Sequence, residues 1–335
     1  MFKVCIRCFT YNHSHYIEDA MTGFVEQETD FPFIATIVDD ASTDNTPQII
    51  ASFWDRYFDT GDSAVAFREE TDYGTVLYAR HKTNHNCFFA IVLLKENHYS
   101  QKKKKSHYVS RWLDDSEYIA LCEGDDYWTS PFKLQKQVDY MEIYPECCMT
   151  ACSALWQVEE RNLPCGCHKR HDCNLTTDEV IRKGGYYLAT ASLLFRSELS
   201  KDWPIWRRKA NVGDFPLQVL GTLRGTLHFF QESMCVYRYR VPGSFSDEHR
   251  VWSADFLFAK IEWMKLLDRD TRHKYKRPIY FHLFNTCYRD LYITRQVGLL
   301  KYLTALMKSD RKFYNASNLR KDIESRLMKK HYANG

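Results

Sequence analysis

Two pairs of adjacent aspartates have the residue types and the positions of a cation- and phosphate-binding site. Asp39-Asp40 and Asp125-Asp126 each follow an apolar run that is typical of a buried strand. Ligands of an open parallel sheet bind beyond the carboxyl ends of its strands. Carboxylates alone would repel a diphosphate, but a carboxylate that holds a hard divalent cation binds phosphate oxygens through that cation. The two pairs therefore predict a site for a cation and a phosphorylated ligand.

The two side chains of the second pair, Asp125 and Asp126, are expected to bind different parts of the ligand. Neighbouring residues of an extended segment point to opposite sides, so one of Asp125 and Asp126 can face a ribose hydroxyl while the other faces the cation. Gly124, just before them, permits close approach of the backbone. An Asp pair after a strand is also a common turn or helix cap, and this structural alternative stays open for each pair taken alone.

The elements that must position these aspartates alternate between strand and helix, which is the pattern of an α/β fold with an open, mostly parallel sheet. Side-chain oxygens of Ser14 and Thr46 are expected to cap the first two helices, with Pro47 at the first helical position of the second. Later in the chain we expect a short helix around Phe215–Leu223, a strand at His228–Tyr239 and mainly helix from about residue 251. The early elements are strands at Phe2–Phe9, Phe33–Val38 and Tyr118–Cys122, the first with Phe2, Val4, Ile6 and Cys8 on one face, and helices that begin at Ser14, Thr46 and Ser130-Pro131.

The composition is that of an ordinary globular chain. Of 335 residues 44% are hydrophobic and 27% charged, and the formal net charge of +3 is too small for a nucleic-acid polycation, so we expect no nucleic-acid partner. No secretion signal is visible, and the longest apolar run, Cys87–Leu94, is far below the roughly 18 residues of a membrane span. The twelve cysteines are then expected to be reduced thiols of a cytoplasmic protein.

The motifs, taken in order along the chain, resemble the family 2 inverting glycosyltransferases, in the variant found in bacterial surface-polysaccharide synthesis. The resemblance covers roughly residues 2–245 and implies a GT-A fold, which is a Rossmann-like open sheet flanked by helices. It also implies transfer of a sugar from a nucleotide-sugar donor, a UDP-sugar as first expectation, to a glycan or lipid-linked acceptor. The matching segments are Phe9–Asn12, Ile37–Thr46, Glu123–Trp128, Gly213–Leu217 and Tyr237-Arg238.

The resemblance implies a role for each matching residue. Thr10, Tyr11 and Asn12 would border the nucleotide together with Asp39, and Asp40 would accept a hydrogen bond from the base. Asp125 would touch the ribose, and Asp126 would bind Mn²⁺ or Mg²⁺ across the diphosphate. Asp214 would take the proton of the acceptor hydroxyl as a general base, in a single displacement that inverts the configuration. Its structural alternative is an N-cap for the helix that begins near Phe215.

The chain also departs from the family pattern. Many members carry a His shortly after the Tyr-Arg pair, where it can be a second metal ligand, but this chain has Arg240, which cannot ligate a cation and could pair with diphosphate. His249 lies nearby and is not a strong candidate. The basic run Lys102–Lys105 either meets the donor phosphates or is a solvated loop, and the loop is the preferred reading.

Several other signals admit two readings. Cys165-Gly166-Cys167-His168, with His171 and Cys173, has the residue types of a zinc site but a compressed spacing. The segment Ala189–Phe195 resembles the family's acceptor side or is a buried strand, and Trp203 and Trp206 either shape the acceptor pocket or belong to the core.

The predicted domains are a catalytic domain, residues 1–250, and a basic helical extension, residues 251–335. The extension either packs on the catalytic domain or touches the inner face of an anionic membrane. The competing function is a GT-A-like protein that binds nucleotide or glycan without catalysis. A nucleotidyltransferase is disfavoured because the first strand is not followed by a Gly-rich loop.

Overall fold

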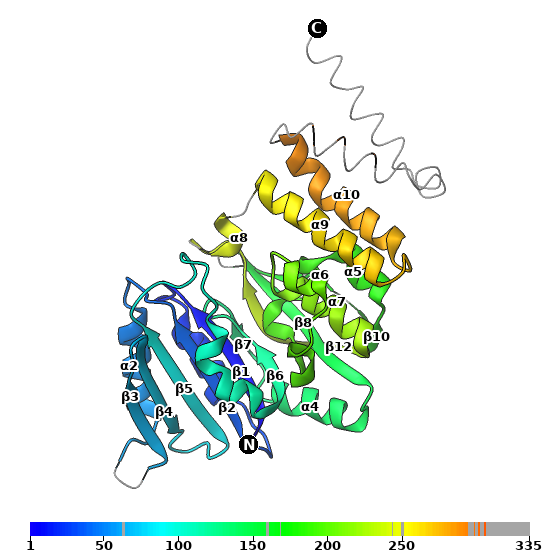
Figure 1. Cartoon of the computed structure of the whole chain (residues 1–335). Coiled ribbons are helices and arrows are strands. Elements are labelled where there is room, and N and C mark those ends of the chain that lie inside the picture. The colour runs from blue at the N-terminus through cyan, green and yellow to red at the C-terminus, as the bar shows by residue number, and fades with distance from the viewer. Residues whose placement is uncertain are drawn as a thin grey trace. The chain divides into compact units, whose positions relative to one another are not determined.

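The computed structural model describes residues 1–61, 64–158, 161–167, 169–242, 244–248 and 251–293, with residues 298, 301 and 305 (Figure 1). The chain forms two compact units. Unit 1 comprises Met1–Val180, Gly184–Trp203 and Asp214–Arg250, and unit 2 comprises Ile181–Lys183, Pro204–Gly213 and Val251–Gly335.

Unit 1 is built on one large sheet. Its strands are β1 (Phe2–Thr10), β2 (Phe33–Asp39), β3 (Ala66–Glu70), β4 (Gly74–Arg80), β5 (Cys87–Leu94), β6 (Ser116–Leu121), β7 (Tyr127–Trp128), β8 (Cys147–Val158), β9 (Arg161–Cys165), β10 (Cys173–Leu175), β11 (Leu194–Arg196) and β12 (Thr226–Arg238). The order along the sheet is β10-β12-β8-β11-β6-β1-β2-β5-β4-β3, with β7 paired to β12 and β9 paired to β8.

The centre of the sheet is parallel and its flanks are mixed. Strands β6, β1, β2 and β5 run parallel to one another, and antiparallel strands extend the sheet on both sides. Residues 60–112, which have no clear pattern in the sequence, supply the antiparallel pair β3 and β4 beside β5. The apolar run Cys87–Leu94 is β5 itself, and it is apolar almost throughout because both of its faces are buried, each in one of two hydrophobic clusters.

Helices cover both faces of this sheet and connect its strands. In unit 1 they are α1 (Ile17–Val25), α2 (Thr46–Tyr57), α3 (Ser110–Asp114), α4 (Lys133–Ile143), α7 (Asp214–Arg224) and α8 (Phe245–Glu248), with short 3₁₀ turns at Ser106–Val109, Gly185–Tyr187, Thr190–Ser192 and Ser197–Ser200; α5 (Thr177–Lys183) runs from unit 1 into unit 2. The expected α/β fold with helices flanking a sheet of parallel central strands is confirmed.

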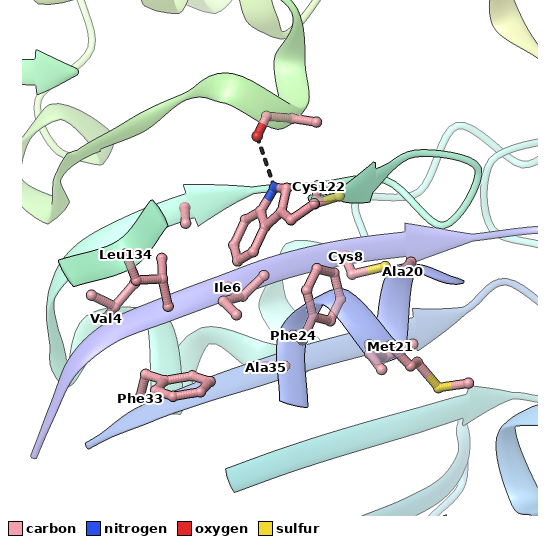
Figure 2. Close-up of a cluster of buried hydrophobic side chains, with 14 of the residues drawn as sticks. Val4, Ile6, Cys8, Ala20, Met21, Phe24, Phe33, Ala35, Cys122 and Leu134 are labelled. Atoms are coloured by element: carbon pink, nitrogen blue, oxygen red, sulfur yellow. Dashed lines mark hydrogen bonds between the residues drawn. The ribbon is translucent and has the colours of Figure 1, made fainter. Parts of the chain in front are cut away.

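The core lies on the two faces of β1, as the alternation in its sequence requires. Val4, Ile6 and Cys8 are fully buried in one cluster, where Phe24 and Met21 of α1 lie against them (Figure 2). Burying a side chain such as Phe24 contributes about 1.5–3 kcal/mol. The expectation that Phe2 shares this face is wrong. Its ring packs against Phe88 of β5 in the second cluster, with ring centroids 5.1 Å apart.

Three helix starts differ from those expected, and none of the three N-cap residues caps its helix through its side chain. Helix α1 begins at Ile17, and the backbone N–H of Ser14 donates to Asp44 Oδ2 (3.1 Å) instead of Ser14 capping the helix. Helix α2 begins at Thr46, whose N–H and hydroxyl both bond Asp44 Oδ1. Helix α4 begins at Lys133, two residues after the expected proline.

Unit 2 contains α6 (Ile205–Lys209), α9 (Ala254–Asp270) and α10 (Lys276–Ile293). Trp206 of α6 is fully buried, its indole N–H bonds Asp270 (3.0 Å), and its ring lies 6.2 Å from that of Trp263. It is therefore a core residue of unit 2. No helix among the described residues is both long and apolar enough to cross a bilayer. Of the predicted basic extension, residues 294–297, 299–300, 302–304 and 306–335 lie outside the described residues.

None of the twelve cysteines, all of which belong to the described part of the chain, forms a disulfide, and ten of them are buried. Burial raises the pKa of Cys165 to about 12 and that of Cys167 to about 11, which favours the protonated thiols. No group of three His, Cys, Asp or Glu side chains suited to a metal occurs in the described part of the chain, and His168 of the predicted zinc cluster lies outside it.

Candidate functional site

Seven of the eight residues singled out in the sequence come together at one edge of the sheet. Strands β1, β2 and β6 are parallel neighbours, so their carboxyl ends meet at that edge, and Thr10 pairs with Asp39 in the register. The loops after the strands are tied together by backbone bonds from Asp40 N to Thr10 O (3.0 Å) and from Gly124 N to Phe9 O (2.9 Å). The two acidic pairs thus lie at the same edge of the sheet.

The segment after β1 offers one exposed ring and one turn residue. Tyr11 is 40% exposed, whereas Thr10 is buried. Asn12 adopts a left-handed backbone conformation (φ 56°), which Asn tolerates better than most residues. Its N–H donates to Ser42 Oγ, and its side-chain oxygen accepts from Thr43 N, both at 2.8 Å. Asn12 therefore joins the β1 and β2 loops, and Tyr11 is the side chain that a ligand can reach.

Asp39 is held by its own loop. It is buried, and its carboxylate accepts the Ser42 hydroxyl (2.5 Å) and the Ser42 backbone N–H (3.1 Å). Burial raises the pKa of Asp39, and the two bonds from Ser42 oppose that rise. The side chain therefore shapes the turn after β2.

Asp40 has a different set of partners, from far along the chain. It is fully buried, and it accepts hydrogen bonds from His98 N (2.7 Å), Tyr99 N (3.0 Å) and Lys105 Nζ (3.0 Å). Its carboxylate thus holds the segment 97–105 against the sheet edge. A direct bond from Asp40 to a nucleotide base stays a prediction, and it requires one of these donors to move.

The basic run before α3 is not uniformly solvated. Lys102, Lys103 and Lys104 are exposed, as a loop predicts. Lys105 differs: its side chain is only 15% exposed, pairs with Asp40, and places its ammonium group 5.2 Å from the Phe9 ring. The interpretation of the whole run as a solvated loop is therefore wrong for Lys105, because a buried carboxylate binds its ammonium group.

Asp125 and Asp126 lie in a turn and not in the extended segment expected from the sequence. The N–H of Asp126 bonds Glu123 O (3.1 Å), which folds the chain back between β6 and β7. Asp126 is 1% exposed, and Asp125 is more accessible. Oδ1 of Asp126 accepts the backbone N–H of Arg238 at 2.9 Å. The turn still gives the two carboxylates different surroundings, as the sequence reasoning required.

The electrostatics of Asp126 favour a cation beside it. Burial, followed by the nearby Asp125 carboxylate, raises the pKa of Asp126 well above its ordinary value. A divalent cation would hold this carboxylate in its ionised form. Mg²⁺ and similar hard cations are often held by one or two carboxylates, with water and phosphate oxygens as the other ligands. The residues present therefore fit such a cation.

Two further residues at this edge were not identified as site residues from the sequence. His13 follows the Phe9–Asn12 motif, and burial lowers its pKa, while the charges of Asp125 and Asp44 oppose that change. A Cβ on Gly124 would lie 3.0 Å from its Nδ1. Arg238 ends β12 and contacts the Asp125-Asp126 turn. The Tyr237-Arg238 motif was the available signal for Arg238, whereas His13 carried no distinguishing pattern.

Asp214 is the first residue of α7, where the helix dipole favours a negative charge. In the structural alternative Asp214 would precede the helix as its N-cap, whereas the helix includes Asp214. Its Oδ2 lies 3.5 Å from the Thr190 hydroxyl, in the segment that resembles the acceptor side. Gly185 lies against Asp214, and the ring of the adjacent Tyr186 is 6.3 Å from that of Tyr239, the residue after Arg238. The residue beside Gly185 therefore contacts the residue that follows Arg238.

The structure describes one of the two residues considered after the Tyr-Arg pair. Arg240 is exposed and lies over the Tyr239 ring at 4.9 Å, and His249 is outside the described residues.

Comparison with known proteins gives a fold and distant relatives. No protein-family profile matches the chain. An uncharacterized protein of Mycobacterium bovis and two of Mycobacterium tuberculosis strains are each 30% identical to it over 256 residues. The match covers 72% of this chain, and the chain spans about 62% of the length of these curated relatives.

The solved structures similar to this chain include S. aureus TarS. TarS residues 1–349 in complex with UDP-GlcNAc match with a TM-score of 0.58 and 17% identity, over 84% of this chain and 71% of that chain. The same protein in complex with UDP matches with a TM-score of 0.57 and 15% identity, over 87% of this chain and 74% of that chain. At this level of identity the likeness shows a shared fold, and the expected GT-A type of α/β fold is confirmed.

Proposed function

We propose that this chain is an inverting glycosyltransferase that transfers a sugar from a nucleotide-sugar donor to a hydroxyl group of a glycan or lipid-linked acceptor in cell-surface polysaccharide synthesis. The observation that carries the proposal is the convergence of Thr10–Asn12, Asp39-Asp40 and Asp125-Asp126 at the carboxyl edge of three parallel strands. TarS, which shares the fold, binds UDP-GlcNAc, and this supports a UDP-sugar as the donor.

The donor would lie across the ends of β1, β2 and β6. The exposed Tyr11 ring would border the base, and the more accessible Asp125 would meet the ribose. Lys105 would be within reach of the same edge, since it is already held there by Asp40. A cationic side chain at this edge offsets part of the repulsion between the buried aspartates and a diphosphate.

Asp126 would hold the divalent cation, Mn²⁺ or Mg²⁺, which when bound neutralises charge on the nucleoside diphosphate that leaves. The protein's contribution is to bury the carboxylate and fix one of its oxygens through the Arg238 backbone N–H. The remaining ligand positions would be taken by phosphate oxygens and water, which suits a site with few protein ligands.

Asp214 would act as the general base. Its place in the first turn of α7 favours the ionised carboxylate that a base needs. It would accept the proton of the acceptor hydroxyl as that oxygen forms a bond to the anomeric carbon, while the bond from that carbon to the diphosphate oxygen breaks. Attack from the side opposite the leaving group inverts the configuration. Thr190, beside Asp214, would help to orient it.

The assignment of residues 1–250 as the catalytic domain and of 251–335 as a helical extension is part of the proposal. We propose a cytoplasmic location, with the basic extension either packed on the catalytic domain or resting on an anionic membrane surface that presents the acceptor.

Thermal stability of the purified protein in the presence of nucleoside diphosphates tests the proposal. UDP, GDP, CDP, dTDP and ADP are each added with and without Mn²⁺, to the wild type and to Asp126→Ala. A ligand that binds only the folded protein raises its melting temperature. We expect UDP to raise it in a Mn²⁺-dependent manner in the wild type and not in Asp126→Ala.

Catalysis is tested separately from binding with Asp214→Asn, a variant of nearly the same shape. It should keep the UDP and Mn²⁺ response but lose release of UDP from UDP-sugar. If the folded wild type responds to no nucleotide, the transferase proposal fails. A nucleotide response without any turnover in the wild type would favour the non-catalytic binding protein.

A further inference from the structure

We propose that Arg238 is the residue that positions the Asp125-Asp126 turn for cation and nucleotide binding, an inference that rests on the proposed function. The turn belongs to no strand pair of its own, since β6 ends at Leu121 and the chain then crosses to pair β7 with β12. The backbone bond from Gly124 to Phe9 of β1 holds the start of the turn, and contacts from the end of β12 hold Asp125 and Asp126.

Arg238 contacts both aspartates of the turn. Its backbone N–H donates to Asp126 Oδ1 (2.9 Å), and its guanidinium Nη1 donates to the carbonyl oxygen of Asp125 (3.0 Å). One residue thus holds the carboxylate that would bind the cation and the backbone immediately before it. Arg238 is 7% exposed, so these bonds are sheltered from competing water.

The rest of the guanidinium group is fixed on all sides. Nε donates to Gln157 Oε1 (3.1 Å) of β8, and Nη2 forms an ion pair with Asp19 of α1. The rings of Tyr16 and Tyr127 lie 5.0 Å and 4.4 Å from its central carbon. Contacts from two aromatic rings and three hydrogen-bond partners leave the side chain little freedom to rotate.

Only an arginine can make this set of contacts. Its planar guanidinium presents several N–H groups in a rigid fork, and it packs on aromatic faces. A lysine keeps the positive charge and can pair with Asp19, but its single nitrogen cannot also reach Gln157 and the Asp125 carbonyl in this geometry. Charge and positioning can therefore be separated by Arg238→Lys.

The chain contains a matched control. Arg196 of β11 also makes three side-chain hydrogen bonds, to the carbonyl oxygens of Cys147 (2.9 Å) and Met141 (2.6 Å) and to the Tyr118 hydroxyl (3.1 Å). Its guanidinium also lies over an aromatic ring, that of Tyr118 at 5.3 Å. None of these partners belongs to the acidic strand ends, so Arg196→Lys reports the general cost of replacing a well-bonded arginine.

The experiment compares the wild type, Arg238→Lys and Arg196→Lys by two measurements. The first is the dissociation constant of UDP in the presence of Mn²⁺, by titration calorimetry. Loss of an outer contact to a metal ligand typically weakens metal binding by about 10–100-fold. Arg238→Lys keeps the backbone bond to Asp126 and loses the side-chain bond to the backbone of Asp125, so we expect the lower end of that range, about tenfold. For Arg196→Lys we expect a change below about twofold, even if both variants lose similar thermal stability.

The second measurement is amide hydrogen exchange in peptides that cover residues 121–128, without any ligand. We expect faster exchange in Arg238→Lys and unchanged exchange in Arg196→Lys. If Arg238→Lys does not fold, Asp19→Asn, which alters a half-exposed partner, is expected to show the same acceleration to a smaller extent.

The outcomes separate the two proposals. Unchanged exchange of the turn in Arg238→Lys, or in Asp19→Asn where that variant replaces it, overturns the positioning role, as does unchanged UDP affinity in a folded Arg238→Lys. A wild type that binds none of the tested nucleoside diphosphates overturns the proposed function, while the exchange data still decide whether Arg238 holds the turn.

Discussion

A methyl group added at Gly124 tests how tightly the site is built. The structure places a Cβ at this position 2.6 Å from Thr10 Oγ1, 2.7 Å from Thr10 Cβ and 3.0 Å from His13 Nδ1. Contacts below 3.0 Å require a displacement. Thr10 is 1% exposed and β-branched, so its side chain cannot simply rotate away. Gly124→Ala must therefore push the Asp125-Asp126 turn away from the end of β1.

The expected cost follows from the number and kind of these contacts. Overpacking a well-filled region costs typically about 1–3 kcal/mol. Two of the close atoms belong to one rigid buried side chain, so we expect Gly124→Ala to lower the free energy of unfolding by about 1–3 kcal/mol. Gly61 is the control, because its nearest neighbour to a new Cβ is Asp59 Oδ1 at 3.5 Å. Gly61→Ala should change stability by less than about 0.5 kcal/mol.

Urea denaturation followed by tryptophan fluorescence measures these differences, and a double-mutant cycle assigns their cause. Thr10→Gly removes both of the closest atoms. In the Thr10→Gly background, the added methyl at Gly124 should cost at least about 1 kcal/mol less than in the wild type. If Gly124→Ala is as harmless as Gly61→Ala, or if its cost is the same with and without Thr10, then the close approach of the two strand ends is not what makes glycine necessary here.

Three other perturbations have expected outcomes. Burial lowers the pKa of His81, so the unfolded chain binds more protons near the ordinary pKa of about 6.5. The contribution of the neutral His81 side chain to the stability of the fold is present above that pH and is lost as the pH falls. The urea midpoint should therefore drop less between pH 7.5 and pH 5.5 in His81→Gln than in the wild type. An equal drop in both proteins would contradict this. Lys105→Met leaves the buried Asp40 carboxylate without its cation and should cost about 1–3 kcal/mol in the same assay; an unchanged midpoint would show that the pair contributes nothing. Native protein treated with iodoacetamide at pH 8.5 should be modified first at the partly exposed Cys148 and Cys173, as peptide mass spectrometry can determine, and rapid modification of the ten buried thiols would contradict the packing.

The sheet and the acidic edge were predictable because their signals are local. Alternating and continuous apolar runs mark β1, β2 and β6 within a residue or two of their bounds. A short acidic stretch directly after a strand needs no knowledge of tertiary contacts to be noticed. The parallel arrangement then brings the strand ends to one edge, and so the position of Asp39, Asp40, Asp125 and Asp126 follows from neighbours in the sequence.

The errors at the starts of elements have causes of different range. Asp44 accepts the N–H of Thr46, two residues away, and the N–H of Ser14 from another loop, so it joins the segment before α1 to the start of α2. Phe2, the first residue of β1, packs against Phe88 of β5 on the face opposite to the one that the alternation predicts. The partners of Ser14 and Phe2 are distant in the sequence and cannot be inferred from the residues beside them, whereas Asp44 stands next to the start of α2.

At the site itself, the hydrogen-bond donors of the buried carboxylates also differ in how far away they lie in the sequence. Asp39 accepts its hydrogen bonds from Ser42, only three residues away, so these donors can be recognised in the sequence. Asp40 and Asp126 take their donors from residues 58 to 112 positions further along the chain. A buried carboxylate without donors costs free energy, so these distant segments are as necessary to the site as the aspartates are. The aspartates indicate in the sequence where a site lies. Whether the site can form depends on hydrogen-bond donors that only the complete fold of unit 1 brings to it. For this reason a substitution of Arg238 is more informative than a substitution of another aspartate.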